Sequence, residues 1–125
     1  MTENELAAIV VDVAYQIHTR LGPGLLESVY HGIMLHELRK RGLSVEFEKA
    51  VPVVWDNIEL EVGFRADLIV EHKLILELKS VEQIARVHKK QLLTYMRLTN
   101  CRLGLLINFG AELIKNGITR VVDKL

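Results

Sequence analysis

The sequence predicts a single α/β domain in which helices pack against a mixed sheet. The chain has 125 residues, the length of one ordinary domain. Apolar residues recur at helical spacing over residues 3–41 and then alternate with a period of two over residues 45–80. A helical segment at residues 84–100 separates these strands from a continuous apolar run at 103–109. Such a run is typical of a strand covered on both faces.

Charge is balanced over the whole chain but not along it. There are 16 basic and 16 acidic side chains, so the net charge indicates no particular partner. Residues 44–82 contain nine acids and four bases, whereas residues 83–111 contain five bases and no acid. This asymmetry suits a phosphate polymer held over metal ions, and it equally fits two solvated faces of different composition.

Cysteine content and hydropathy indicate a cytoplasmic protein. Cys101 is the only cysteine, so no internal disulfide can form and no oxidising compartment is indicated. The apolar runs at residues 7–11 and 103–107 are too short to cross a bilayer. Acids stand near the N-terminus where a signal peptide has bases. We therefore expect no membrane span.

Two helices are predicted first. Thr2 and Glu5 have the spacing of a capping box before a helix at residues 3–20. The Leu-Gly-Pro-Gly that follows ends this helix, because proline cannot continue the hydrogen-bond ladder. A second helix is predicted at residues 25–41 and ends at Gly42. The residues expected to face the core are Leu6, Ile9, Val10, Val13 and Ile17 in the first helix and Leu26, Tyr30, Ile33, Met34 and Leu38 in the second.

The rest of the chain alternates between strands and one helix. A tight turn at Asp56-Asn57 separates the first two strands. Because a helix connects the third strand to the fourth, these two strands are expected to be parallel with a right-handed crossover. In chain order we predict strands at residues 45–55, 59–70 and 74–80, a helix at 84–100, and strands at 103–109 and 118–122.

The strand register decides whether two acids in this sheet are neighbours. A two-residue loop at His72-Lys73 would place Asp67 and Glu77 on opposite faces. A three-residue loop at residues 71–73 would place Asp67 opposite Glu77. The second register also gathers the leucines of both strands on one apolar face together with Ala66 and Val70, so the hydrophobic pattern favours it.

Directly opposed carboxylates repel each other, and a hard divalent cation removes this repulsion. Mg²⁺ and Mn²⁺ prefer carboxylate oxygens, so Asp67 and Glu77 are candidate metal ligands. Lys79 lies on the same side of its strand as Glu77 and can orient water or stabilise phosphoryl charge. The alternative is a solvated hairpin face on which Glu77 and Lys79 form a weak surface pair.

The spacing of these three residues resembles a known nuclease motif. Asp67, Glu77 and Lys79 form D-x₉-E-x-K, the pattern of the PD-(D/E)xK nuclease superfamily. Ala66 precedes Asp67 where the motif's name has proline. The predicted order of elements is similar to the core of that superfamily, a restriction-endonuclease-like αβββαβ core, here with an extra N-terminal helix over a single domain of residues 1–125.

Two further motifs extend the resemblance over nearly the whole chain. Members of the superfamily often carry an acid on the helix before the sheet, and here that helix carries Glu27. One large branch carries Q-x-x-x-Y on the later helix, and here Gln91 and Tyr95 have this spacing. The stretch GLLESVY at residues 24–30 resembles the signature of the small GxxExxY family.

The resemblance implies a nuclease that uses Mg²⁺ or Mn²⁺ to activate water against a phosphodiester of nucleic acid, with DNA the favoured substrate. It implies that the metal ligands are Asp67, Glu77, the backbone carbonyl of Leu78 and, as an outer ligand, Glu27. The catalytic residues would be Glu27, Asp67, Glu77, Lys79 and Gln91. For Glu27 the alternative is a helix N-terminal acid stabilised by the macrodipole.

Several side chains are candidates for substrate contact, each with a structural alternative. The two tyrosines also suit the core, the histidine also suits a half-exposed structural position, and the bases also suit a solvated helix face. These candidates are Tyr95, Tyr30, His88, Arg86, Lys89 and Lys90.

Two other classes of function remain open. One is a non-catalytic nucleic-acid-binding or adaptor module built on a nuclease fold, and the other is a structural domain whose polar residues are incidental. The chain is small for a nuclease that grips a duplex alone, so a homodimer is expected by analogy with small resolvases of this fold.

Overall fold

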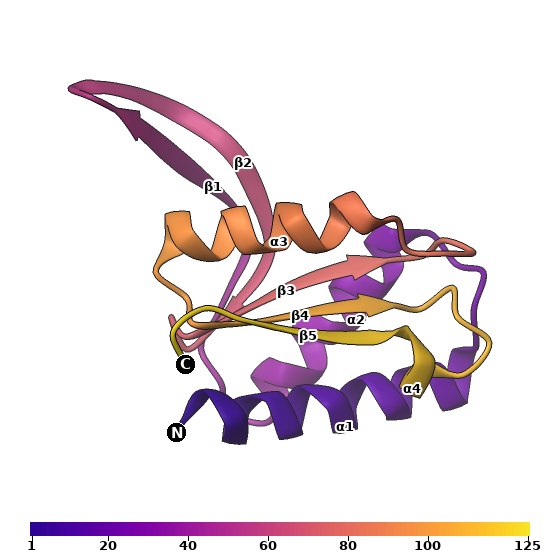
Figure 1. The fold of residues 1–125 in the computed structure, drawn as a ribbon. Helices are drawn as coiled ribbons and strands as arrows, with labels where there is room; N and C mark the ends of the chain where they lie inside the picture. Colours follow the sequence, from indigo (N-terminus) through magenta and orange to yellow (C-terminus); the bar gives the residue numbers. More distant parts are fainter.

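A five-stranded sheet with helices on both faces forms the computed structural model, which describes residues 1–125 (Figure 1). Helix α3 lies on one face, and α1 and α2 lie on the other (Figure 1). The elements are α1 (Glu3–Leu21), α2 (Glu27–Lys40), β1 (Val45–Trp55), β2 (Ile58–Val70), β3 (Leu74–Lys79), α3 (Arg86–Thr99), β4 (Leu103–Asn108), α4 (Ile114–Gly117) and β5 (Ile118–Val122).

The sheet has the strand order β1-β2-β3-β4-β5 and is mixed, as predicted. Only β3 and β4 are parallel, and α3 connects them. The other neighbouring strands are antiparallel. The predicted αβββαβ order is therefore confirmed, with α1 as the extra N-terminal helix. The single-turn helix α4 before β5 was not predicted, because four residues are too short for a periodic signal.

Helices α1 and α2 cover the larger core. Thr2 and Glu5 form the predicted capping box, and the inward stripe of α1 packs on the leucines of β3 and β4. One predicted core residue of α2 is wrong, because Leu26 is 75% exposed. Leu26 has extended backbone angles as the residue before α2, so its side chain does not follow the helical stripe. None of the helices combines the length and hydropathy that a membrane span requires.

Helix α3 covers the smaller core on the opposite face. Leu92 and Met96 are fully buried against Ile75 and Leu106. The helix lies close to β4 at Gly104, where an added Cβ would stand 2.9 Å from Met96 Sδ. Glycine at this strand position therefore sets how closely α3 approaches the sheet.

The hairpin of β1 and β2 extends past the rest of the sheet (Figure 1). β1 pairs with β2 from Val45↔Val70 to Trp55↔Ile58, but β2 pairs with β3 only from Leu68 to Val70. The prediction that Ala66 shares the leucine face is wrong, since Ala66 packs in the smaller core. The hairpin turns away from β3 at this point, and simple alternation no longer describes which layer a side chain meets.

Tyr30 ties α2 to the loop before it. Its side chain is fully buried and stacks on Phe109, with ring centroids 4.4 Å apart. Its hydroxyl donates to the Gly22 carbonyl at 2.6 Å and accepts from the Leu25 N–H at 3.2 Å. These contacts hold the loop from α1 against the end of β4.

We expect Tyr30→Phe to lower the free energy of unfolding by about 1–2 kcal/mol, because two backbone groups lose their shared partner while the ring stacking persists. Urea denaturation measures this loss. Tyr15→Phe is the matched control, since the Tyr15 residue is 51% exposed and makes no such bonds. Equal stability of Tyr30→Phe and Tyr15→Phe would contradict the role of the hydroxyl.

Candidate active site

The turn between β2 and β3 sets the register of the site. It has three residues, and Glu71 and His72 both adopt positive φ values of 53° and 57°. The pairs that follow are Val70↔Leu74 and Leu68↔Leu76. This is the predicted register, and it brings the next residues of each strand, Asp67 and Glu77, to the same place in the sheet.

The two acids lie where the strands separate. Backbone pairing between β2 and β3 ends at Leu68↔Leu76. Beyond this pair, side-chain oxygens accept hydrogen bonds from the backbone N–H groups. Asp67 Oδ2 accepts a hydrogen bond from the Leu78 N–H at 2.8 Å. Glu77 Oε1 accepts a long one, 3.5 Å, from the Asp67 N–H. Each carboxyl group therefore links the diverging strands by accepting from a backbone N–H of the other strand.

Glu77 is buried, with 8% of the residue exposed, and its environment disfavours the charge. Burial and then the neighbouring Asp67 carboxylate raise the pKa of Glu77 to about 8. The Glu77 carboxyl group therefore releases its proton less readily than an exposed glutamate does. Two adjacent carboxyl groups, one of them buried, supply oxygen ligands for a hard divalent cation. The cation would stabilise their ionised forms.

The donor set fits Mg²⁺ or Mn²⁺ on chemical grounds. Asp67 and Glu77 supply carboxylate oxygens, and the bond from Asp67 to the Leu78 amide holds the Leu78 backbone beside them. No group of three or more His, Cys, Asp or Glu side chains is arranged to hold an ion. A cation here would therefore complete its coordination with backbone oxygens or water, as Mg²⁺ usually does.

Lys79 is close enough to act on the same site. It lies two residues after Glu77 at the end of β3 and is half-buried. Its positive charge partly offsets the rise in the pKa of Glu77. The Lys79 carbonyl accepts from the Phe109 N–H at 2.8 Å, so the backbone that carries the side chain is fixed by the end of β4.

His31 is a site residue that the sequence interpretation missed. Its Nε2 lies 3.3 Å from Asp67 Oδ2 and its Nδ1 lies 3.7 Å from Glu48 Oε1. Neither buried nitrogen makes a well-aligned hydrogen bond. Burial opposes a charge on the ring, but Asp67, the Leu78 backbone and Glu48 outweigh it and raise the pKa of His31. The available signal was its position four residues after Glu27 on one helix face.

Glu48 was also missed, and its backbone is unusual. It has a φ of 46° within β1, a conformation that is uncommon for a residue other than glycine. This conformation occurs in the part of the hairpin that faces Asp67, and its side chain approaches His31. No pattern in the sequence indicates a left-handed residue inside a strand.

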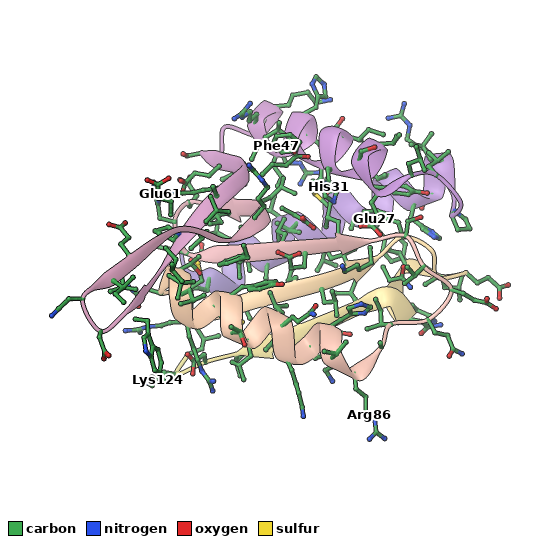
Figure 2. The ribbon with its side chains drawn as sticks, turned by 90° about the horizontal axis from the view of Figure 1, so that it is seen from above. Glu27, His31, Phe47, Glu61, Arg86 and Lys124 are labelled. Atoms are coloured by element: carbon green, nitrogen blue, oxygen red, sulfur yellow. The ribbon has the colours of Figure 1, made fainter.

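Glu27 stands apart from the acid pair. It begins α2, is half-buried, and lines a groove of about 720 Å³ together with Ser80, Glu82 and Gly110. Figure 2 shows Glu27 and His31 on α2, facing the sheet. Glu27 does not form a three-acid metal cluster with Asp67 and Glu77. The outer role expected for Glu27 stays a prediction.

Helix α3 contributes one predicted residue closely and others at the surface. Tyr95 stacks on Phe64 with ring centroids 4.0 Å apart. Partial burial, and then the charges of Glu77 and Asp67, raise the pKa of Tyr95, so its hydroxyl is near the acids. Gln91, one turn earlier, is exposed. The ring of Tyr95 therefore packs against the smaller core, and its contact with substrate stays a prediction.

The remaining candidates are spread along the start of α3. Arg86, Lys89 and Lys90 are exposed, and Figure 2 shows Arg86 pointing away from the sheet. His88 is half-buried, and its Nδ1 accepts from the Ala85 N–H at 3.1 Å, which is a helix-capping role. The structural alternative for His88 is therefore the one its contacts favour.

Tyr30 does not fit the predicted contact with substrate. Its ring is fully buried, and both hydrogen-bonding directions of its hydroxyl are used by Gly22 and Leu25. Its place on the inward stripe of α2, beside Met34, explains this burial.

Comparison with known proteins assigns the family. Residues 4–121 match the family model described as PD-(D/E)XK nuclease superfamily. This match covers nearly all of the chain, so the protein belongs to that superfamily. Comparison with curated proteins and with solved structures finds no match.

The raised pKa of Glu77 predicts a distinct pH dependence of stability. The folded carboxyl binds its proton more tightly than the unfolded one, so stability is full below pH 4.5 and falls as pH rises to about 8. The loss reaches up to about 5 kcal/mol. Glu77→Gln should remove this fall, because the amide does not ionise.

The measurement is urea denaturation in EDTA across this pH range. Glu61→Gln, an exposed carboxyl group on β2, is the control and should follow wild type. Parallel curves for wild type and Glu77→Gln would show that Glu77 is not the perturbed group.

Proposed function

We propose that this protein is a metal-dependent nuclease that hydrolyses phosphodiester bonds in nucleic acid, with DNA as the substrate class. The observation that carries the proposal is the pairing of Asp67 with buried Glu77 at diverging strands. Membership of a nuclease superfamily supports the same reaction class.

Asp67 and Glu77 would hold Mg²⁺ or Mn²⁺, which supplies Lewis-acid activation of water and of the phosphoryl oxygens when bound. Leu78 would add its carbonyl, and Glu27 would act as an outer ligand from the groove that it lines with Ser80. Lys79 places an ammonium group near Glu77, where it can orient the attacking water or stabilise the negative charge of the transition state. From α3, Tyr95 and the exposed Gln91 one turn before it would position the substrate.

The exposed bases of α3 would contact the phosphate backbone. Arg86, Lys89 and Lys90 occupy the first turns of α3, where the helix dipole also favours anions. Contacts of this kind set register and affinity without reading sequence. The proposal therefore includes little sequence preference and, because a chain of 125 residues offers limited surface, a homodimer.

Cleavage of a nucleic-acid panel tests the proposal. Linear duplex, single strand, four-way junction and RNA are incubated with Mn²⁺, Mg²⁺ or EDTA. We expect metal-dependent cutting by wild type, its loss in Glu77→Ala, and about a 100-fold lower rate in Lys79→Ala. Glu61→Ala, at an exposed carboxyl group outside the site, should cut like wild type.

Equal cutting by wild type and Glu77→Ala would reject this site. Binding of the panel without cutting, in all metals, would support the non-catalytic module instead. Neither binding nor cutting would leave only the structural role.

His31 should position Asp67 for metal binding. We expect His31→Asn to weaken Mn²⁺ binding by about tenfold or more, because the ring nitrogen 3.3 Å from Asp67 Oδ2 would no longer orient that carboxylate. Isothermal titration calorimetry measures this affinity without reference to cleavage. His18→Asn is the matched control, since His18 is equally buried but bonds the Ala111 carbonyl, and it should bind Mn²⁺ normally. Equal weakening in both variants would indicate a general loss of stability.

A further inference from the structure

The distal part of the β1–β2 hairpin, residues 53–62, lies beyond the smaller core and no helix covers it, and we call it the arm. It projects beyond the helices and the other strands (Figure 1). Its strands pair only with each other, because β2 meets β3 only at Leu68–Val70. A two-stranded ribbon of this kind is marginally stable alone in water. We therefore expect a binding partner to cover the arm.

One face of the arm is apolar. The register pairs Val53 with Leu60 and Trp55 with Ile58, and directly opposed residues share a face. We call these four residues the arm patch. Trp55 is 72% exposed, Ile58 61% and Leu60 54%. Large apolar side chains gathered in this way on a small ribbon mark an interaction surface.

The opposite face of the arm is acidic. Val54 pairs with Glu59 on that face, and Glu61 follows by alternation. Figure 2 shows Glu61 on the arm, on the side away from α3. Asp56 stands in the turn at the tip. The arm patch itself carries no charge.

The acidic residues of the arm indicate which kind of partner can bind the arm patch. Nucleic acid and anionic lipid surfaces are repelled by Asp56, Glu59 and Glu61, and the proposed nucleic-acid face is the basic helix α3. A second copy of the chain meets no such repulsion, because an uncharged patch can face its own copy across a two-fold axis. Both acidic faces then remain in water.

The backbone of the edge strand β1 favours association through the arm patch rather than through edge-to-edge strand pairing. β1 is an edge strand, and Pro52 removes a backbone donor from it beside the irregularity between Val51 and Val53. Extension of the sheet from edge to edge is disfavoured at that point. Packing of one arm patch on another needs no free backbone donor.

We propose that the arm patch is the dimerisation surface of this protein and that its occupant is a second copy of the chain. This inference deepens the homodimer included in the proposed function. Asp67 stands at the base of the arm on β2, so each copy keeps its own acid pair at the foot of the paired arms. The test measures mass and fluorescence, so it can fail while the nuclease proposal stands, or hold while that proposal fails.

Analytical ultracentrifugation of the full chain over a range of concentrations is the first measurement. Wild type should approach twice the 14.3 kDa of one chain, and Leu60→Glu and Ile58→Glu should stay at one chain's mass, because they place like charges against each other. Val54→Glu is the matched control, since Val54 is 63% exposed on the opposite face of the same arm, and it should dimerise like wild type. Circular dichroism checks that each variant folds.

Trp55 supplies a second measurement, because it is the only tryptophan in the chain. Its emission should shift to longer wavelength when wild type is diluted, whereas Leu60→Glu should show the shifted emission at every concentration. Monomeric wild type at all concentrations, or dimeric Leu60→Glu, would overturn the proposal. So would monomeric wild type whose Trp55 emission changes only on adding duplex DNA or lipid vesicles, since these would then be the occupants.

Discussion

The separation of β2 from β3 after Leu68↔Leu76 is the constraint on which the rest of the structure depends. If the strands stayed paired, backbone carbonyls would accept hydrogen bonds from the amides at this point. Here the Asp67 carboxylate accepts from the Leu78 N–H, and the Glu77 carboxyl group accepts a long hydrogen bond from the Asp67 N–H. Side-chain oxygens thus replace carbonyls in a buried place. The replacement concentrates negative charge where the protein can least solvate it, which is why Glu77 binds a proton so tightly.

The two helical layers hold this separation open from opposite sides. On one side α2 places His31 against Asp67, and Tyr30 fixes the loop that leads into α2. On the other side α3 packs close to Gly104 and brings Tyr95 over Phe64 at the base of the hairpin. Buried carboxyl groups this close together need rigid surroundings, because relaxation of either layer would let water solvate the acids.

Most of the fold could be predicted from the sequence because its signals are local. The capping box at Thr2, the turn at Asp56-Asn57 and the apolar run of β4 each act within a few residues, and all three appear as expected. The register of Asp67 and Glu77 was also accessible, since burying the leucines selects it. Leu26 and Ala66 were placed wrongly, because a helix start and a diverging strand both break the periodicity that pattern analysis assumes.

The sequence by itself determined the order of the elements, the parallel pairing of β3 with β4 and the acid–acid–lysine constellation, since periodicity and spacing are properties of the chain. Only the tertiary structure decided that His31 and Glu48 join Asp67 and that the arm stands uncovered. These facts depend on contacts between elements far apart in the chain. The position of α2 over the sheet, and the point at which a ribbon leaves it, result from packing of the whole core and are not encoded in any one segment.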